Sequence, residues 1–202
     1  PTVTVVFTIL HAGGKFGGNG YKVSGGLHGV GASVVNALSS WLEVEVKDGK
    51  HVYKQRYEKG NIVTGLDIIG DTDETGTTVT FKPDPSIFTD TTVYDYETLK
   101  KRLREQAFLN AGIRIELKDS RTDVYEPQTE EFFYEGGIRS YVEFLLDGIK
   151  KDRLHQDVIY LSTASEDQTA EIALLWSTAY DSKIMSFANT LYTVDGGTHE
   201  QG

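Results

Sequence analysis

The residues of this sequence that are best suited to chemistry lie in one glycine-rich segment. The run Gly26-Leu27-His28-Gly29-Val30-Gly31 leads directly into an apolar stretch, Val34 to Trp41, that has the spacing of one helix face. Glycines before a helix let backbone N–H groups approach an anion closely, and the helix dipole adds partial positive charge there. This pattern predicts a loop that binds phosphate.

The charge around this segment favours the same interpretation. Nine of the 21 glycines lie between Gly13 and Gly31, and residues 1–40 contain Lys15 and Lys22 but no Asp or Glu. A carboxylate near the loop would repel a phosphate, so its absence is favourable. A simpler interpretation stays open, in which the glycines form a flexible connection, the lysines are solvated and His28 is an ordinary loop histidine.

The spacing of the glycines excludes several phosphate-binding families. No Lys follows Gly29 or Gly31 as a P-loop requires, and Gly-x-Gly-x-x-Gly, the dinucleotide fingerprint, has Val34 or Val23 where its third glycine belongs. A kinase-type glycine hairpin has strands on both sides, whereas a helix is predicted here.

Composition excludes other classes of function. The chain of 202 residues, long enough for one or two domains, has no cysteine, and its five histidines are scattered without the spacing of a metal site. A net charge of −10 argues against a surface that holds nucleic acid by its phosphates. No apolar run is long enough to cross a membrane, and we expect a reducing compartment, the cytoplasm.

Several elements must position the loop. The apolar segment up to Leu10 fits a buried strand or a helix end, and the helix after the loop carries Val34, Ala37, Leu38 and Trp41 on one face. Alternating runs then predict strands at Leu42–Val46, Val52–Tyr57 and Thr77–Phe81.

The second half of the chain predicts further helices and strands. Asp95 is the expected N-cap of a helix with Tyr96, Leu99, Leu103 and Ala107 on one stripe and Gly112 at C′. Charged residues 147–157 are the expected domain junction. The remaining predicted elements are a strand at Ile113–Leu117, a hairpin loop at 119–129, a helical stripe at Ile138, Val142 and Leu145, and strands at Val158–Ser162, Ile172–Trp176 and Ile184–Leu191.

At this level of detail the sequence resembles the B subunits of bacterial DNA gyrase. The resemblance begins with Leu10 to Phe16 and Tyr21 to Ser39 and extends, in family order, over nearly the whole chain. The later matching runs are Glu74-Thr75-Gly76-Thr77, Leu103 to Asn110, Tyr134 to Ile138, and Gly196-Gly197-Thr198-His199.

The resemblance implies an α+β fold, the two-layer ATPase sandwich with a mixed sheet that gyrases share with histidine kinases, heat-shock chaperones and mismatch-repair proteins. Residues 1–150 would be part of an ATP-binding domain whose lid over ATP is formed by residues 13–31. Residues 151–202 would begin a transducer domain of ribosomal S5-like β/α fold, which relays the ATP state to the rest of the enzyme.

The resemblance also implies ATP and Mg²⁺ as cofactors. Gly14 and Lys15 would contact phosphate, Tyr21 would bond the adenine end and Thr77 would lie near the adenine. The amides expected to surround the triphosphate belong to Gly26, Leu27, His28, Gly29, Val30, Gly31 and Ala32.

In the family, the general base, the Mg²⁺ ligand and the adenine-reading turn come from upstream segments. A transducer Lys that reaches the γ-phosphate, and the metal-binding domain, come from downstream segments, so we expect the chain to be truncated at both ends. No catalytic or metal-binding residue is assigned within it, and the isolated chain is expected to be inactive.

The function implied for the parent is that of a type IIA topoisomerase that couples ATP hydrolysis to strand passage and supercoiling. Its implied partners are the gyrase A subunit, double-stranded DNA and a second copy of the N-terminal region in an ATP-dependent homodimer. The alternatives are the B subunit of topoisomerase IV and a non-enzymatic protein-binding module.

Overall fold

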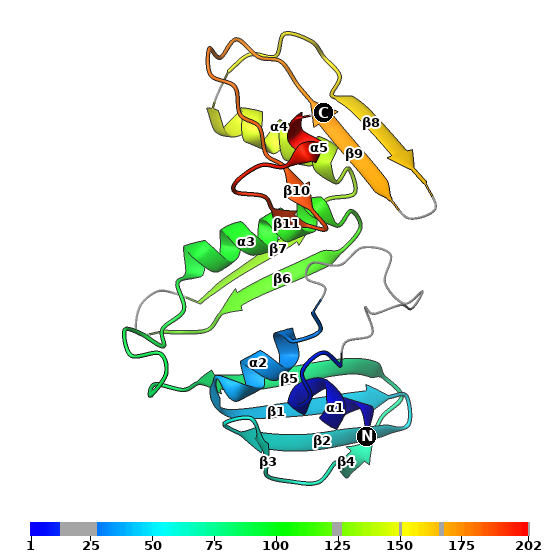
Figure 1. Ribbon diagram of the computed structural model, residues 1–202, viewed down its shortest axis with the longest axis vertical. Coiled ribbons are helices and arrows are strands. Elements are labelled where there is room, and N and C mark those ends of the chain that lie inside the picture. Colours follow the sequence, from blue (N-terminus) through cyan, green and yellow to red (C-terminus); the bar gives the residue numbers. More distant parts are fainter. Residues whose placement is uncertain (13–27, 123–126, 150, 166–167, 202) are drawn as a thin grey trace. The chain divides into compact units, whose positions relative to one another are not determined.

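The computed structural model describes residues 1–12, 28–122, 127–149, 151–165 and 168–201 (Figure 1). These residues form two compact units, Pro1–Val93 and Tyr94–Gly202, each containing helices and sheets. The predicted α+β class is confirmed, and every strand pairing among the described residues is antiparallel. The predicted junction at 147–157 lies within the second unit.

The first unit is a sheet with two short helices. Its strands pair in the order β3-β2-β1-β5, and β4 also pairs with β2. The elements are α1 (Thr2–Thr8), α2 (Gly31–Ala37), β1 (Ser39–Asp48), β2 (His51–Glu58), β3 (Asn61–Ile62), β4 (Asp67–Asp71) and β5 (Thr75–Pro83).

One face of this sheet carries the core of the unit. Leu42 and Val44 of β1 are fully buried together with Tyr57 of β2, and the ring of Phe7 from α1 lies 5.9 Å from that of Tyr57. Ala32 of α2 packs against the same cluster, so both helices cover this face of the sheet. Because strand side chains alternate between faces, the neighbours of Leu42 and Val44 along β1 point to the opposite face.

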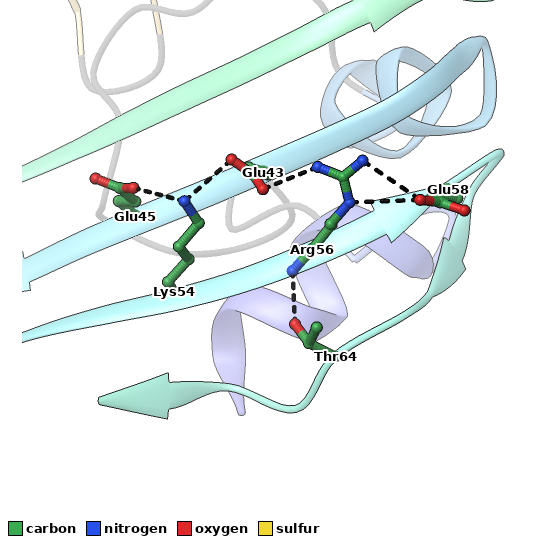
Figure 2. A network of polar contacts seen from close by, with 6 residues as sticks. All are labelled: Glu43, Glu45, Lys54, Arg56, Glu58 and Thr64. Carbon is green, nitrogen blue, oxygen red and sulfur yellow. Dashed lines mark hydrogen bonds and ion pairs between the residues drawn. The ribbon is translucent and has the colours of Figure 1, made fainter. Parts of the chain in front are cut away.

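The opposite face carries a network of ion pairs (Figure 2). Glu43 lies directly opposite Arg56 in the register and Glu45 lies opposite Lys54. Lys54 Nζ lies 3.0 Å from Glu43 and 3.1 Å from Glu45, and Arg56 Nη1 lies 2.9 Å from Glu43. The hydrogen bonds from Arg56 and then Lys54 lower the pKa of the Glu43 carboxyl below its usual value.

A tight turn joins β1 to β2. The carboxylate of Asp48 accepts hydrogen bonds from the backbone N–H groups of Lys50, at 2.9 Å, and His51, at 2.8 Å. Gly49 between them has a φ of 86°, a conformation that glycine adopts without a steric penalty. The local sequence therefore specifies where the chain reverses.

The second unit combines two longer helices with three two-stranded sheets. The sheets are β6–β7, β8–β9 and β10–β11. The elements are α3 (Tyr96–Leu109), β6 (Arg114–Asp119), β7 (Gln128–Phe133), α4 (Ile138–Ile149), β8 (Ile159–Ala164), β9 (Thr169–Leu174), β10 (Phe187–Ala188), β11 (Leu191–Tyr192) and α5 (Thr198–Gln201).

Aromatic stacking joins α3 to α4. Asp95 caps α3 as predicted, because its carboxylate accepts the N–H of Thr98 at 2.7 Å. Near the other end of α3, the buried ring of Phe108 stacks on Tyr134 and on Tyr141, with centroids 3.7 Å and 4.7 Å apart. The predicted helical stripe after Gly137 is confirmed as α4.

Some predicted boundaries were wrong. The segment up to Leu10, left open between strand and helix, forms α1, and the helix after the loop ends at Ala37, so Trp41 belongs to β1. Gly112 follows the C-cap, Asn110, by two residues and is not C′.

The predicted strand Ile184–Leu191 is interrupted at Asn189 and Thr190, which adopt positive φ values of 48° and 68° in the turn between β10 and β11. Two consecutive positive φ values are typical of the tightest hairpin turns.

Candidate nucleotide-binding site

The structure describes six of the eleven residues predicted to contact ATP, all in the first unit. Five are consecutive, His28 to Ala32, at the start of α2, and the sixth is Thr77 in β5. The predicted contacts Gly14, Lys15, Tyr21, Gly26 and Leu27 lie outside the described residues.

A histidine contact holds the described end of the glycine-rich segment. The Nδ1 atom of His11 lies 3.0 Å from the backbone carbonyl oxygen of His28, and the two rings meet edge to face with centroids 6.4 Å apart. Because a carbonyl oxygen only accepts, Nδ1 of His11 carries the proton and donates. This contact fixes the start of the His28–Ala32 backbone relative to the end of α1.

Gly29 has a backbone conformation that favours glycine. Its φ is 60°, in the left-handed region where a Cβ atom is unfavourable. The chain enters α2 two residues later, and the hydroxyl of Ser33 donates to the carbonyl of Val30 at 3.0 Å. Residues His28 to Gly31 are exposed or only partly buried.

Asn36 links α2 to the neighbouring backbone, a role that the sequence analysis did not predict. Its side-chain amide is fully buried and donates to the carbonyls of Phe7, at 2.9 Å, and Gly60, at 3.4 Å. The prediction that the apolar face of α2 is buried is wrong. Ser33 and Asn36 are the buried residues of this helix, and Val34 is 40% exposed. The polar Asn36 between apolar neighbours is the feature of the sequence that could have indicated this role.

A second set of bonds ties α1 to the sheet. The side-chain oxygen of the buried residue Gln55 accepts from the hydroxyls of Thr4, at 2.8 Å, and Tyr57, at 2.7 Å. Since His11 follows α1, these bonds and the packing of Phe7 position His11 as well.

Thr77 lies on the same side of the sheet as α2. It pairs with Val46 in the β1–β5 register, two residues from the pair Val44–Val79. Alternation places the side chains of Thr77, Val46 and Val44 on the helix-covered face. Thr77 is exposed, in agreement with a position that a ligand can reach.

The electrostatics of the unit favour an anion on this face. Residues 1–40 contribute no carboxylate. The carboxylates of Glu43 and Glu45 lie on the other face, where Lys54 and Arg56 neutralise them (Figure 2). The sheet thus separates the carboxylates of Glu43 and Glu45 from the face covered by α1 and α2.

Neither a metal cluster nor a membrane span is found in the described part of the chain. No group of three or more His, Asp or Glu residues there is arranged to hold a metal ion. The described helices include none that is long and apolar enough to cross a bilayer.

Comparison with known proteins identifies the family of this chain. A family model described as DNA gyrase B matches residues 137–202. The DNA gyrase B subunit of Streptococcus pneumoniae is 53% identical over 202 residues, which are 100% of this chain and 31% of that protein. This chain belongs to the DNA gyrase B family. The gyrase B subunits of Streptococcus pyogenes and Staphylococcus epidermidis are 55% and 54% identical, also over 100% of this chain and over 30% and 31% of their own lengths.

A solved gyrase B structure has the same fold. The crystal structure of the 43K ATPase domain of Thermus thermophilus gyrase B, in complex with an aminocoumarin, matches with a TM-score of 0.80 and 34% identity. The match covers 98% of this chain and 49% of that chain. The chain therefore spans about half of that ATPase domain and about a third of the curated gyrase B proteins. The relatives named here carry the gyrase name, so topoisomerase IV and a non-enzymatic binding module are not favoured.

Proposed function

We propose that this chain forms part of the ATP-binding region of a DNA gyrase B subunit, where ATP binding and hydrolysis drive type IIA strand passage and supercoiling. One observation carries the proposal: almost the whole chain superimposes on the gyrase B ATPase domain of Thermus thermophilus. The topoisomerase activity belongs to the whole B subunit together with its partners.

The triphosphate is proposed to lie against the amides of Gly26 to Ala32, with Gly14 and Lys15 on the phosphates. The left-handed conformation of Gly29 and the absence of carboxylates in residues 1–40 support this placement. Tyr21 is proposed to bond the adenine end, and Thr77, on the helix-covered face, to lie near the base.

The domain assignment follows the same proposal. Residues 13–31 would act as the ATP lid, residues 1–150 belong to the ATP-binding domain, and residues 151–202 begin the transducer domain. The two compact units divide instead at Val93 and Tyr94. The helices α3 and α4, which pack together through Phe108 and Tyr141, therefore belong to the second compact unit but to the proposed ATP-binding domain.

Hydrolysis of ATP needs a general base and a metal ion in addition to a phosphate cradle. Among the described residues, no group of three or more His, Asp or Glu side chains is arranged to hold a metal ion. Other parts of the gyrase B protein are proposed to supply the ligands of Mg²⁺. Bound Mg²⁺ would neutralise charge on the phosphates.

The proposed partners are the gyrase A subunit, double-stranded DNA and a second gyrase B protein that associates when ATP binds. The cytoplasm is the proposed location, in agreement with a chain that has no cysteine. The net charge of −10 suggests that DNA contacts belong mainly to other parts of the enzyme.

The test is reconstitution of a full-length gyrase B protein that carries this sequence with its gyrase A partner. We expect ATP-dependent negative supercoiling of relaxed plasmid DNA, and none with a non-hydrolysable ATP analogue. ATP-dependent relaxation without supercoiling would favour topoisomerase IV. Absence of both activities, in a protein that folds and binds gyrase A, would refute the enzymatic proposal.

A further inference from the structure

The second unit contains a cavity of about 920 Å³ among α3, α4 and the segment 182–192. This volume is in the range of pockets that hold drug-sized molecules, roughly 300–1,000 Å³. The cavity shares no residue with the glycine-rich segment or with Thr77. Which ligands the cavity can bind therefore depends on its own lining residues.

Aromatic and aliphatic side chains form much of the wall. Phe108 and Tyr141 are almost parallel, at an interplanar angle of 7°, and Leu145 and Met185 line the cavity beside them. Tyr192 of β11 contributes a further ring. Phe108 is only 1% exposed beneath its stacked neighbours, so the ring surface open to a ligand belongs mainly to Phe144 and Tyr192, which are 41% and 43% exposed. Exposed aromatic surface of this kind favours a ligand with a ring.

The only acidic residue among those that line the cavity is neutralised. The carboxylate of Glu105 is ion-paired with Arg102 and accepts the hydroxyl of Tyr141 at 3.4 Å. Burial, followed by the charge of Glu105, raises the pKa of Tyr141 to about 12, so the phenol remains a donor at neutral pH. The negative charge of Glu105 is therefore neutralised by Arg102 within the wall of the cavity.

Two lysines provide cations for a ligand. Of the four basic residues that line the cavity, Arg102 is paired with Glu105 and Arg104 contacts Glu130 at 3.3 Å. Lys101 and Lys183 have no carboxylate partner in the part of the chain that the structure describes. They come from different segments, α3 and the stretch before β10. The lining is thus positive within a chain of net charge −10, and a concave site focuses such a field.

We propose that this cavity binds a small organic anion with a flat apolar ring, the anionic group between Lys101 and Lys183 and the ring against the aromatic wall. The carboxylates, sulfonates and phosphates of ring compounds share this chemistry. The site differs from the proposed ATP site in its unit and in every residue. The proposal stands on the lining alone and does not rest on the proposed nucleotide function.

Calorimetric titration of the full chain with two matched probes, naphthalene-1-sulfonate and the neutral naphthalene-1-methanol, tests the proposal. We expect saturable 1:1 binding of the sulfonate, at least about tenfold tighter than the alcohol and weaker at high salt. The double variant Lys101→Glu, Lys183→Glu should lose at least tenfold in sulfonate affinity. Met185→Trp, which fills the cavity without changing its charge, should weaken both probes.

The matched control is Lys118→Glu combined with Lys151→Glu. These lysines belong to the same unit, are exposed and lie outside the cavity, and the control changes the net charge by the same amount. Its sulfonate affinity should stay within about twofold of the original, and thermal melts should show that all variants fold.

Three results would overturn the proposal. Equal affinity for the sulfonate and the alcohol would mean an apolar cavity without anion preference. An equal loss in the control variant would mean general charge attraction, and no saturable binding at millimolar probe would mean that the space is not a site. If the charge-reversed double variant does not fold, Lys101→Gln with Lys183→Gln, which removes the charges without reversing them, takes its place with the same expectation of weaker sulfonate binding.

Discussion

The Nδ1 atom of His11 donates to the backbone carbonyl of His28 across 17 positions of sequence, and so joins the end of α1 to the backbone that enters α2. His11 itself has a φ of 61°, which is uncommon for a residue other than glycine. The contact connects the core of the first unit to the proposed phosphate site.

We expect His11→Ala to weaken nucleotide binding several-fold in a full-length gyrase B protein that carries this sequence. A net hydrogen bond contributes about 1 kcal/mol, and its loss frees the backbone at His28. His11→Asn is the matched control, since asparagine tolerates a positive φ and offers an amide donor. Calorimetry with a non-hydrolysable ATP analogue compares the variants. Equal affinities for alanine and the original would show that the contact does not position the site.

Gly29→Asp is expected to abolish nucleotide binding while leaving the fold intact. A like charge about 4 Å from a phosphate costs about 4 kcal/mol at an effective dielectric of 20, far more than the ~1.4 kcal/mol that corresponds to a tenfold loss. Gly29→Asn has nearly the same shape without the charge and should bind much better. The measurement is the same calorimetric titration beside a thermal melt. An aspartate variant within threefold of the original affinity would contradict the phosphate assignment.

Glu43→Gln should change how stability depends on acid. The pKa of Glu43 is lowered in the folded chain, so its carboxylate stabilises the fold above the usual carboxyl pKa, and this contribution is lost as the pH falls through the lowered value. At neutral pH we expect a loss of less than about 1 kcal/mol, because exposed pairs contribute little.

The measurement for Glu43→Gln is urea unfolding at neutral and acidic pH. The difference in the free energy of unfolding between the variant and the original should become smaller as the pH falls. Glu135→Gln is the control, because Glu135 is exposed and has no ion-pair partner among the described residues. A difference that stays constant with pH would contradict the assignment.

Asp95→Ala should destabilise the second unit by about 1 kcal/mol, the usual value of a helix N-cap. Its carboxylate accepts the N–H of Thr98 at 2.7 Å, and no other side chain caps α3. Asp95→Asn keeps a capping oxygen without the charge and should lie close to the original. Urea unfolding followed by circular dichroism measures both. A loss as large for asparagine as for alanine would indicate that charge, not the hydrogen bond, matters here.

Local patterns predicted those elements whose residues interact with near neighbours. Alternation located β1, β2 and β5, and Asp95 marked the start of α3, because pleat geometry and capping depend on a few adjacent residues. The glycine spacing pointed to Gly29, whose left-handed conformation the structure shows.

Long-range contacts account for what the sequence did not predict. Asn36 is buried because its amide reaches carbonyls at Phe7 and Gly60, both distant in sequence. Likewise, α1 consists largely of β-branched residues that favour strands, but its Phe7 packs on Tyr57 and the helix is retained. The contact between His11 and His28 had no local signal at all.

The turn at Asp48 to His51 also has a consequence for the order in which the first unit assembles. It brings together residues as close as Lys47 and Val52, five positions apart, whereas docking of Phe7 on Tyr57 closes a span of fifty. Hairpins form in roughly 1–10 μs, and contacts at longer range form later because they must overcome a larger loss of chain entropy. We therefore expect the β1–β2 hairpin to be the folding nucleus on which α1 and β5 condense. Amides of β1 and β2 should accordingly gain protection first in pulse-labelled hydrogen exchange, which makes this turn a determinant of folding rate as well as of shape.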